Sequence, residues 1–124
     1  MGYSKVSLDE IEAHELDDPE RTIFPIGVEL RPQKMRPSVW EYEASETSTQ
    51  HYQREQEELY VPLSGEFEME LEEEDGEEAT VLELQSGDFL VVDPETTRQL
   101  TAVTDGRILV AGAPNVKDDG VIVE

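Results

Sequence analysis

Residues 66–72 read Glu66-Phe67-Glu68-Met69-Glu70-Leu71-Glu72, a strict alternation of acidic and apolar side chains. Because successive side chains of a β-strand point to opposite faces, this period of two predicts a strand with one buried face and one solvated face. The acidic run that follows surrounds Asp75-Gly76, a dipeptide typical of tight hairpin turns. Residues 81–84 are therefore expected to return as the partner strand.

Further short strands are expected on both sides of this hairpin. We predict strands at 22–30, 39–43, 89–92, 100–103 and 107–110, with a turn at 87–88 and a second hairpin at Asp105-Gly106. No segment has the periodicity of a long helix. Short strands at this spacing favour an all-β sandwich or barrel. The tail from Pro114 is expected to lie along the outside of this domain.

Composition limits the classes of partner. The chain has 124 residues, enough for one domain, and its 31 acidic residues against nine basic ones give a net charge of −22. Such a surface repels phosphate backbones and anionic lipid headgroups, so we expect neither a nucleic acid nor a membrane as partner. Without a cysteine the chain forms no disulfide, and residues 1–10 lack an apolar signal core. We therefore expect a cytoplasmic protein.

Polar side chains suited to a site are concentrated in residues 51–65. His51 and Gln53 are two residues apart and would point to the same face of a strand; Glu58 follows, and Gly65 stands at the next turn. On the inner face of a barrel, such groups would converge on one small cavity.

This segment resembles the first motif of the cupin superfamily, which reads His, any residue, His, three or four residues, Glu, six residues, Gly. His51, Glu58 and Gly65 match it, and Gln53 stands where the family has its second histidine. A second stretch, which begins at Gly87 and runs to residue 100, resembles the second cupin motif. There Arg98 falls where the family has a histidine.

The resemblance implies a cupin-type double-stranded β-helix, a jelly-roll barrel, over residues 25–113. Residues 1–24 would then form an N-terminal extension that supplies an edge or dimer strand, and residues 114–124 a C-terminal tail. The resemblance also implies a homodimer. Trp40, Tyr42, Tyr60 and Phe89 are expected in the core or the cavity wall, whereas His14 and Arg54 are expected at the surface.

The substitutions relative to the family bear on the metal site. Cupins hold a metal with three histidines and a glutamate, whereas this sequence offers His51, Gln53, Glu58 and Arg98. A guanidinium stays protonated and cannot ligate a cation. A glutamine oxygen is a weak ligand for transition metals. A metal would therefore depend on His51 and Glu58, with Gln53 as a weak third ligand, and we expect either no cofactor or a weakly held divalent metal.

The sequence leaves two roles open for Arg98. Its permanent positive charge could form a structural ion pair with Glu58, or it could receive the carboxylate or phosphate of a ligand. Ligand-binding residues are accordingly expected to be His51, Gln53, Glu58 and Arg98.

Several functions fit these residues. The first is a small barrel that binds a metabolite, an anion among the candidates, with a degenerate metal site. The second is a metal-dependent oxygenase, isomerase or lyase that uses His51 and Glu58, and a metal-free acid–base isomerase would use the same two residues. The third is an interaction protein that pairs through its edge strands. Whether the chain is an enzyme stays open, because a fold does not fix a function.

The excess of acid predicts adaptation to a salt-rich cytosol. Of the 31 acids 22 are glutamates, and only three residues are lysines. At ordinary ionic strength these charges repel one another and oppose the compact state. In molar salt the screening length falls to about 3 Å, and most of this repulsion disappears.

We expect the melting temperature to rise steadily as KCl is increased from about 0.1 M to about 2 M, because screening removes the repulsion. Calorimetry across the KCl series measures this directly. A melting temperature that stays constant or falls with salt would contradict the halophilic interpretation.

Overall fold

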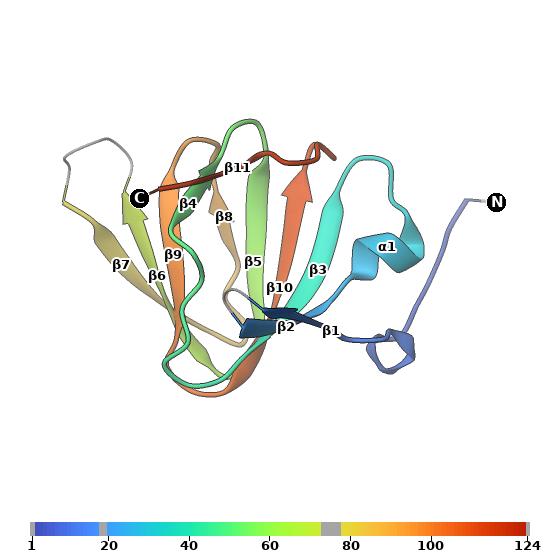
Figure 1. Cartoon of the computed structure of the whole chain (residues 1–124), viewed down its shortest axis with the longest axis horizontal. Coiled ribbons are helices and arrows are strands. Elements are labelled where there is room, and N and C mark those ends of the chain that lie inside the picture. The colour runs from blue at the N-terminus through green and yellow to red at the C-terminus, as the bar shows by residue number, and fades with distance from the viewer. Residues whose placement is uncertain (1, 18–19, 73–77, 124) are drawn as a thin grey trace.

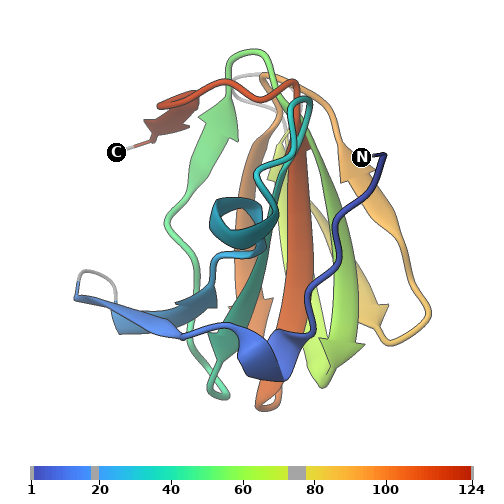
Figure 2. The ribbon, with the colours of Figure 1, turned by 90° about the vertical axis from the view of Figure 1, so that its right-hand side faces the viewer.

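The computed structural model describes residues 2–17, 20–72 and 78–123, which fold into two antiparallel β-sheets packed face to face (Figures 1 and 2). The six-stranded sheet has the order β1-β2-β3-β10-β5-β8, and the five-stranded sheet has the order β11-β4-β9-β6-β7. Among the described residues, no helix is long and apolar enough to cross a membrane.

The six-stranded sheet consists of β1 (His14–Asp17), β2 (Glu20–Phe24), β3 (Arg36–Tyr42), β10 (Gly106–Ala113), β5 (Glu57–Ser64) and β8 (Leu90–Val92). The other sheet consists of β11 (Gly120–Ile122), β4 (His51–Gln53), β9 (Thr97–Ala102), β6 (Glu66–Glu72) and β7 (Thr80–Gln85). A short 3-10 helix (Leu8–Glu10) and the single-turn helix α1 (Ile26–Leu30) flank the sheets.

The alternating segment forms β6 with the expected bounds, and β7 pairs with it. Phe67 and Met69 point inward and are almost fully buried, whereas Glu66, Glu68 and Glu70 face solvent. The predicted Asp75-Gly76 turn lies outside the described residues. The period of two thus fixes which face of β6 enters the core.

The core lies between the two sheets. It contains Tyr42, Tyr60, Phe67, Met69, Leu84, Val92, Leu100, Ala102, Ile108 and Val110. Tyr42 and Phe67 meet edge to face, with ring centroids 5.9 Å apart, an arrangement that aromatic pairs prefer.

Gly65 and Gly106 allow the turn between β5 and β6 to pack closely against the turn between β9 and β10. Gly65, between β5 and β6, has φ +79, and a side chain there would collide with the backbone of Asp105. A side chain at Gly106 would likewise collide with the Ser64 carbonyl oxygen. The glycine that ends the first cupin-like motif is therefore required both by backbone conformation and by close packing.

The predicted strand at 22–30 is wrong in its second half. β2 ends at Phe24, and α1 begins after Pro25. Proline has no N–H to donate to a strand ladder and is well suited to the start of a helix. The apolar residues Ile26 and Val28 therefore belong to a helical turn.

The predicted hairpin at Asp105-Gly106 is also wrong. A turn does lie there, but β9 pairs with β4 and β6, whereas β10 pairs with β3 and β5. The turn therefore carries the chain from one sheet to the other. A turn dipeptide specifies the local reversal of the chain and not the partner of each strand.

Phe89 is not a core or cavity residue. It precedes β8, the edge strand of the six-stranded sheet, and is 73% exposed. Val91, which the sequence placed in a fully apolar strand, also faces outward and is exposed. Trp40, Tyr42 and Tyr60 do line the cavity described below.

The C-terminal tail is part of the barrel and not an outer strap. β11 adds to the five-stranded sheet by pairing with β4. The carboxylate of the buried Asp119 accepts hydrogen bonds from the backbone N–H groups of Glu55, at 2.9 Å, and Gln56, at 2.8 Å. The tail thus holds the turn between β4 and β5, which carry the cupin-like motif.

The N-terminal residues extend the six-stranded sheet. β1 is its edge strand, and the segment before β1 runs outside the barrel on the side of α1 (Figures 1 and 2). The division of the chain at residue 24 and the dimer role of this edge remain predictions.

We expect Asp119→Asn to lower the free energy of unfolding by about 1–3 kcal/mol, because it weakens the acceptor for the buried N–H of Gln56 and the partly buried N–H of Glu55. Asp118→Asn, an exposed neighbouring change, is the matched control and is expected to have little effect. Urea denaturation of both variants measures the difference, and equal stability of the two would contradict the assignment.

This difference should also depend on pH. Burial raises the pKa of Asp119, but the N–H groups of Gln56, Glu55 and Arg54 outweigh burial and hold the pKa below its ordinary value of 3.8. A carboxyl with a lowered pKa in the folded state stabilises it above that ordinary value, and the stabilisation is lost as the pH falls through the lowered pKa. The gap between wild type and Asp119→Asn should therefore shrink below about pH 4.

Candidate functional site

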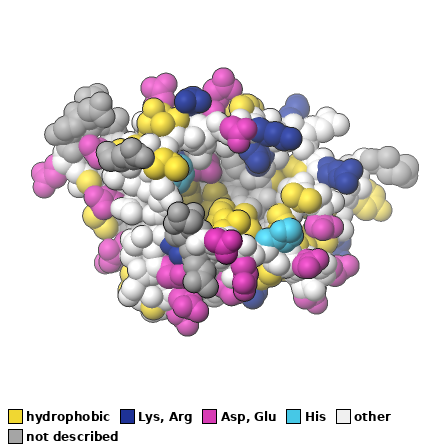
Figure 3. Space-filling model, in the orientation of Figure 1, with side chains coloured by type: hydrophobic (Ala, Val, Ile, Leu, Met, Phe, Trp, Pro, Cys, Tyr) yellow, Lys and Arg dark blue, Asp and Glu magenta, His cyan; other side chains and the backbone are white. Residues whose placement is uncertain are grey.

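A cavity of about 380 Å³ opens between the two sheets. Its apolar wall includes Leu16, Trp40, Leu100, Val110 and Ile122. Its polar and tyrosine side chains include Arg21, Tyr42, His51, Gln53, Glu58 and Tyr60. In Figure 3 hydrophobic side chains surround the hollow near the middle of the face shown.

Glu58 is the centre of the polar cluster. Its Oε1 lies 3.2 Å from Nη1 of Arg98 and accepts a hydrogen bond of 2.8 Å from the hydroxyl of Tyr60. Arg98 is only 1% exposed and also donates from Nη2 to the Asp93 carbonyl oxygen at 3.1 Å. Arg98 therefore lies behind Glu58, and Glu58 is the member of the pair that lines the cavity.

His51 lies next to the pair formed by Glu58 and Arg98. The register of β4 and β9 places His51 opposite Arg98, and Nε2 of His51 is 4.0 Å from Oε1 of Glu58. Nδ1 is 2.8 Å from the Thr49 carbonyl oxygen. Because a carbonyl only accepts, Nδ1 is the protonated nitrogen whenever the ring is neutral, and the lone pair then lies on Nε2. The neutral form of His51 thus presents an acceptor to the cavity.

Gln53 lies on the same face of β4 as His51 and is buried at the cavity wall. Of the four side chains that the sequence singled out, His51, Gln53 and Glu58 line the cavity directly. Arg98 reaches the site only through Glu58.

Two tyrosines add neutral hydroxyl groups. Burial raises the pKa of Tyr60 well above its ordinary value, and the charge of Glu58 raises it further. Burial also raises the pKa of Tyr42, against a smaller opposing effect of Arg21. Both side chains therefore stay protonated at neutral pH, and Tyr60 serves as a donor to Glu58.

No family model matches this sequence, and no curated protein matches it either. Solved structures do match its fold. KdgF from Halomonas sp. superposes with a TM-score of 0.76 at 19% identity, over 93% of this chain and 98% of that one. An RmlC-like cupin from Shewanella frigidimarina superposes with a TM-score of 0.73 at 16% identity, over 95% and 98% of the two chains. The chain has the cupin fold.

A third solved structure contains a ligand. Streptomyces PAC13, determined with uridine, superposes with a TM-score of 0.73 at 16% identity, over all of this chain and 93% of that one. These likenesses establish the jelly-roll architecture that the two motifs implied.

The donor set in this cavity does not fit a tightly held metal. Among the described residues, no group of three or more His, Cys, Asp or Glu side chains is placed to bind one ion. Oε1 of Glu58 already contacts a guanidinium and a tyrosine hydroxyl, and the fixed charge of Arg98 would repel a cation at the same place. His51 and Glu58 alone fall short of the three protein ligands usual for a catalytic zinc.

Several residues of the cavity wall were not predicted from the sequence, Arg21 and Ile122 among them. Arg21 on β2 is 7% exposed, forms a 3.0 Å ion pair with Glu46 and places its guanidinium 4.8 Å from the centre of the Tyr42 ring. The alternation of β2, which puts Arg21 on the same face as Ile23, was the available signal. Ile122 comes from the tail strand β11, whose three residues show no usable period.

We expect Arg98→Met to lower the free energy of unfolding by about 3–5 kcal/mol, because it leaves the Glu58 carboxylate largely buried without its cation. Glu58→Gln combined with Arg98→Met should cost less than Arg98→Met alone, since no unpaired charge remains. Denaturation of both single variants and the double variant completes the cycle. Additive losses would show that the two side chains do not interact.

Proposed function

We propose that this cupin binds a small organic ligand in the cavity between its sheets. The cavity volume, about 380 Å³, lies within the range of small-molecule pockets, and its wall is mainly apolar with a few convergent polar groups. Trp40 and Leu100 would contact the body of the ligand, while His51 and Glu58 would orient its polar end.

The contact between Glu58 and Arg98 is the observation that carries the proposal. Arg98 balances the negative charge of Glu58, and Glu46 balances the positive charge of Arg21 in the cavity wall. A cavity with balanced charges favours hydroxyl and N–H groups over a bare ion. His51 Nε2 offers an acceptor to such a group, and Gln53 offers an amide.

The same contact bears on the two roles left open for Arg98. A guanidinium that is buried, paired with Glu58 and bonded to Asp93 has little left to offer a ligand anion. This supports the structural ion pair over direct anion binding by Arg98.

An enzymatic role is the second candidate. His51 Nε2 and Glu58 Oε1 lie 4.0 Å apart, so a single ligand atom could contact both from the cavity side, which suits a metal-free proton transfer. The metal-dependent oxygenase, isomerase or lyase would use the same two residues, with Gln53 as a third ligand, and the donor set supports it less.

The chain provides an internal control for ligand binding, because it has only two histidines and His14 lies exposed on β1. We expect a bound ligand to shift the ring nitrogen signals of His51 in ¹H–¹⁵N spectra and to leave those of His14 unchanged. A fragment library that includes uridine and neutral sugars serves as the screen. Glu58→Gln should weaken any hit at least about tenfold, through loss of a charged acceptor.

Saturable binding that leaves the His51 signals unchanged would place the ligand elsewhere and contradict the proposal. Reloading the protein with Mn, Fe, Ni or Zn, followed by elemental analysis, addresses the metal. We expect well under one equivalent to be retained. One tightly held equivalent that is lost in His51→Ala would favour the metal-dependent enzyme instead.

A further inference from the structure

A second hollow lies beside the cavity, between α1, β3 and the segment that leads to β11. Its volume is about 820 Å³, and it shares Trp40, Gln53 and Glu58 with the cavity wall. A ligand bound at Glu58 could therefore extend into this hollow, which we call the groove.

The groove collects basic residues in a chain that has few. Of the nine lysines and arginines, Arg31, Arg36 and Lys117 line it. In Figure 3 dark-blue side chains gather above and to the right of the central hollow. Against a net charge of −22, this rim is a local exception.

These three bases differ in their partners from the arginines that form ion pairs. Arg21, Arg98 and Arg107 are each paired with a glutamate. Within the part of the chain that the structure describes, no carboxylate forms an ion pair with Arg31, Arg36 or Lys117.

Three acids also line the groove, and two of them are already engaged. Glu58 is paired with Arg98, and the carboxylate of Asp119 accepts backbone N–H groups. Asp118 is exposed and offsets part of the positive charge. Because Arg98 neutralises Glu58, the three bases face only the two charges of Asp118 and Asp119, and one positive charge remains for an added anion.

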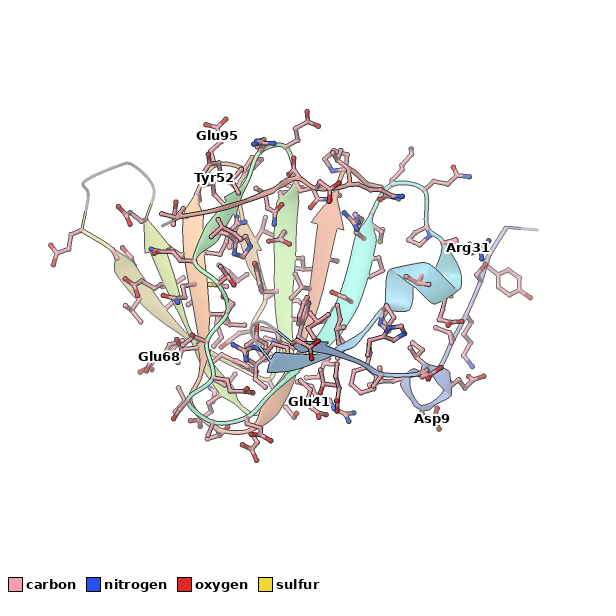
Figure 4. The ribbon with its side chains drawn as sticks, viewed as in Figure 1. Asp9, Arg31, Glu41, Tyr52, Glu68 and Glu95 are labelled. Atoms are coloured by element: carbon pink, nitrogen blue, oxygen red, sulfur yellow. The ribbon has the colours of Figure 1, made fainter. Side chains whose placement is uncertain are left out.

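The backbone at Arg31 supplies a second observation. Arg31 ends α1 in the left-handed conformation, with φ 52 and ψ 53, where glycine or asparagine is favoured (Figure 4). A long side chain in this region carries backbone strain, and such strain tends to occur where the side chain has a role.

Arg36 also lines the groove, where a hydrogen bond to the C-terminal tail fixes its side chain. Its Nη1 donates to the Val116 carbonyl oxygen at 2.9 Å, which ties β3 to the tail next to Lys117. A guanidinium has five N–H donors, so this contact leaves others to bind an anion. An arginine fork matches the oxygens of a carboxylate or a phosphate.

We infer that the groove binds the anionic group of the ligand, a carboxylate or a phosphate, through Arg31, Arg36 and Lys117. The inference rests on the proposed ligand-binding function and adds the chemical class of the ligand. A surface this acidic repels anions at long range, so an anionic ligand needs a local basic site to bind. The groove provides that site where it joins the cavity.

Titration with inorganic phosphate and with acetate, each replacing KCl at constant ionic strength, tests this inference. In backbone ¹H–¹⁵N spectra we expect saturable shifts at Arg31, Arg36 and Lys117. The apparent Kd should rise at least about fivefold in Arg36→Gln and in Lys117→Gln, as expected on losing a charged hydrogen bond. Arg107→Gln removes a partly exposed arginine that does not line the groove and that lies at the far end of the β3–β10 pair from Arg36, and it should change the Kd less than about twofold.

Arg31→Gly separates binding from folding. Glycine suits the left-handed position, so this variant should melt no lower than the wild type and yet bind the anion more weakly. Response to phosphate alone would indicate a phosphorylated ligand, and response to acetate alone a carboxylate. Either response, or both, supports the inference.

Absence of saturable shifts in the groove, or an equal loss of affinity in Arg107→Gln, would overturn the inference. This failure is distinct from failure of the proposed function. In the first case a neutral ligand still shifts His51 while both anions leave the groove unchanged. In the second case the groove binds anions and no ligand perturbs His51.

Discussion

The ion pair between Glu58 and Arg98 determines the charge and the geometry of the candidate site. Both charges lie between the two sheets, where taking an ion out of water is costly unless it is paired and hydrogen-bonded. Arg98 meets this condition through Glu58 and the Asp93 carbonyl oxygen, although no described group bonds its buried Nε. The carboxylate is in turn held by Arg98 and Tyr60, so its position toward His51 is fixed before any ligand arrives.

The charges that line the cavity are paired, whereas the surface carries a large excess of acidic side chains. β6 pairs with β7 in a register that places Glu68 directly opposite Glu83. Figure 4 shows Glu68 on the outside of the sheet. Like charges across a strand pair are destabilising at low salt. Screening weakens such exposed repulsion far more than it weakens the buried contact between Glu58 and Arg98. Salt would therefore act mainly on the surface and leave the site geometry intact.

The sequence predicted those parts of the fold whose signal is local or carried by a motif. The alternation at Phe67 and Met69 fixed one strand and its buried face, and the two cupin-like motifs implied the barrel that the comparisons establish. The pairing around Asp105-Gly106 was mispredicted, because a turn dipeptide does not encode the sheet that each flanking strand joins. Phe89 was mispredicted because hydrophobic character does not reveal that β8 is an edge strand.

The sequence likewise predicted the part of the site that the motifs carry. The motif spacing singled out His51, Gln53 and Glu58, which line the cavity, and Arg98, which pairs with Glu58. The role of the tail was not predictable, because Asp119 acts through backbone N–H groups 63 and 64 residues away in the sequence. Such long-range contacts leave no periodic signal.

The placement of charge also constrains how an anionic ligand could bind. An unpaired anion in the cavity would be desolvated beside the Glu58 carboxylate, whose countercharge from Arg98 is already engaged. The same anion in the groove would remain in contact with solvent and with exposed bases such as Arg36, so its desolvation would be smaller. A ligand could avoid this cost by placing its charged group in the groove and its uncharged body against Trp40. Such a ligand would contact both regions, because Trp40 lines the cavity and the groove alike.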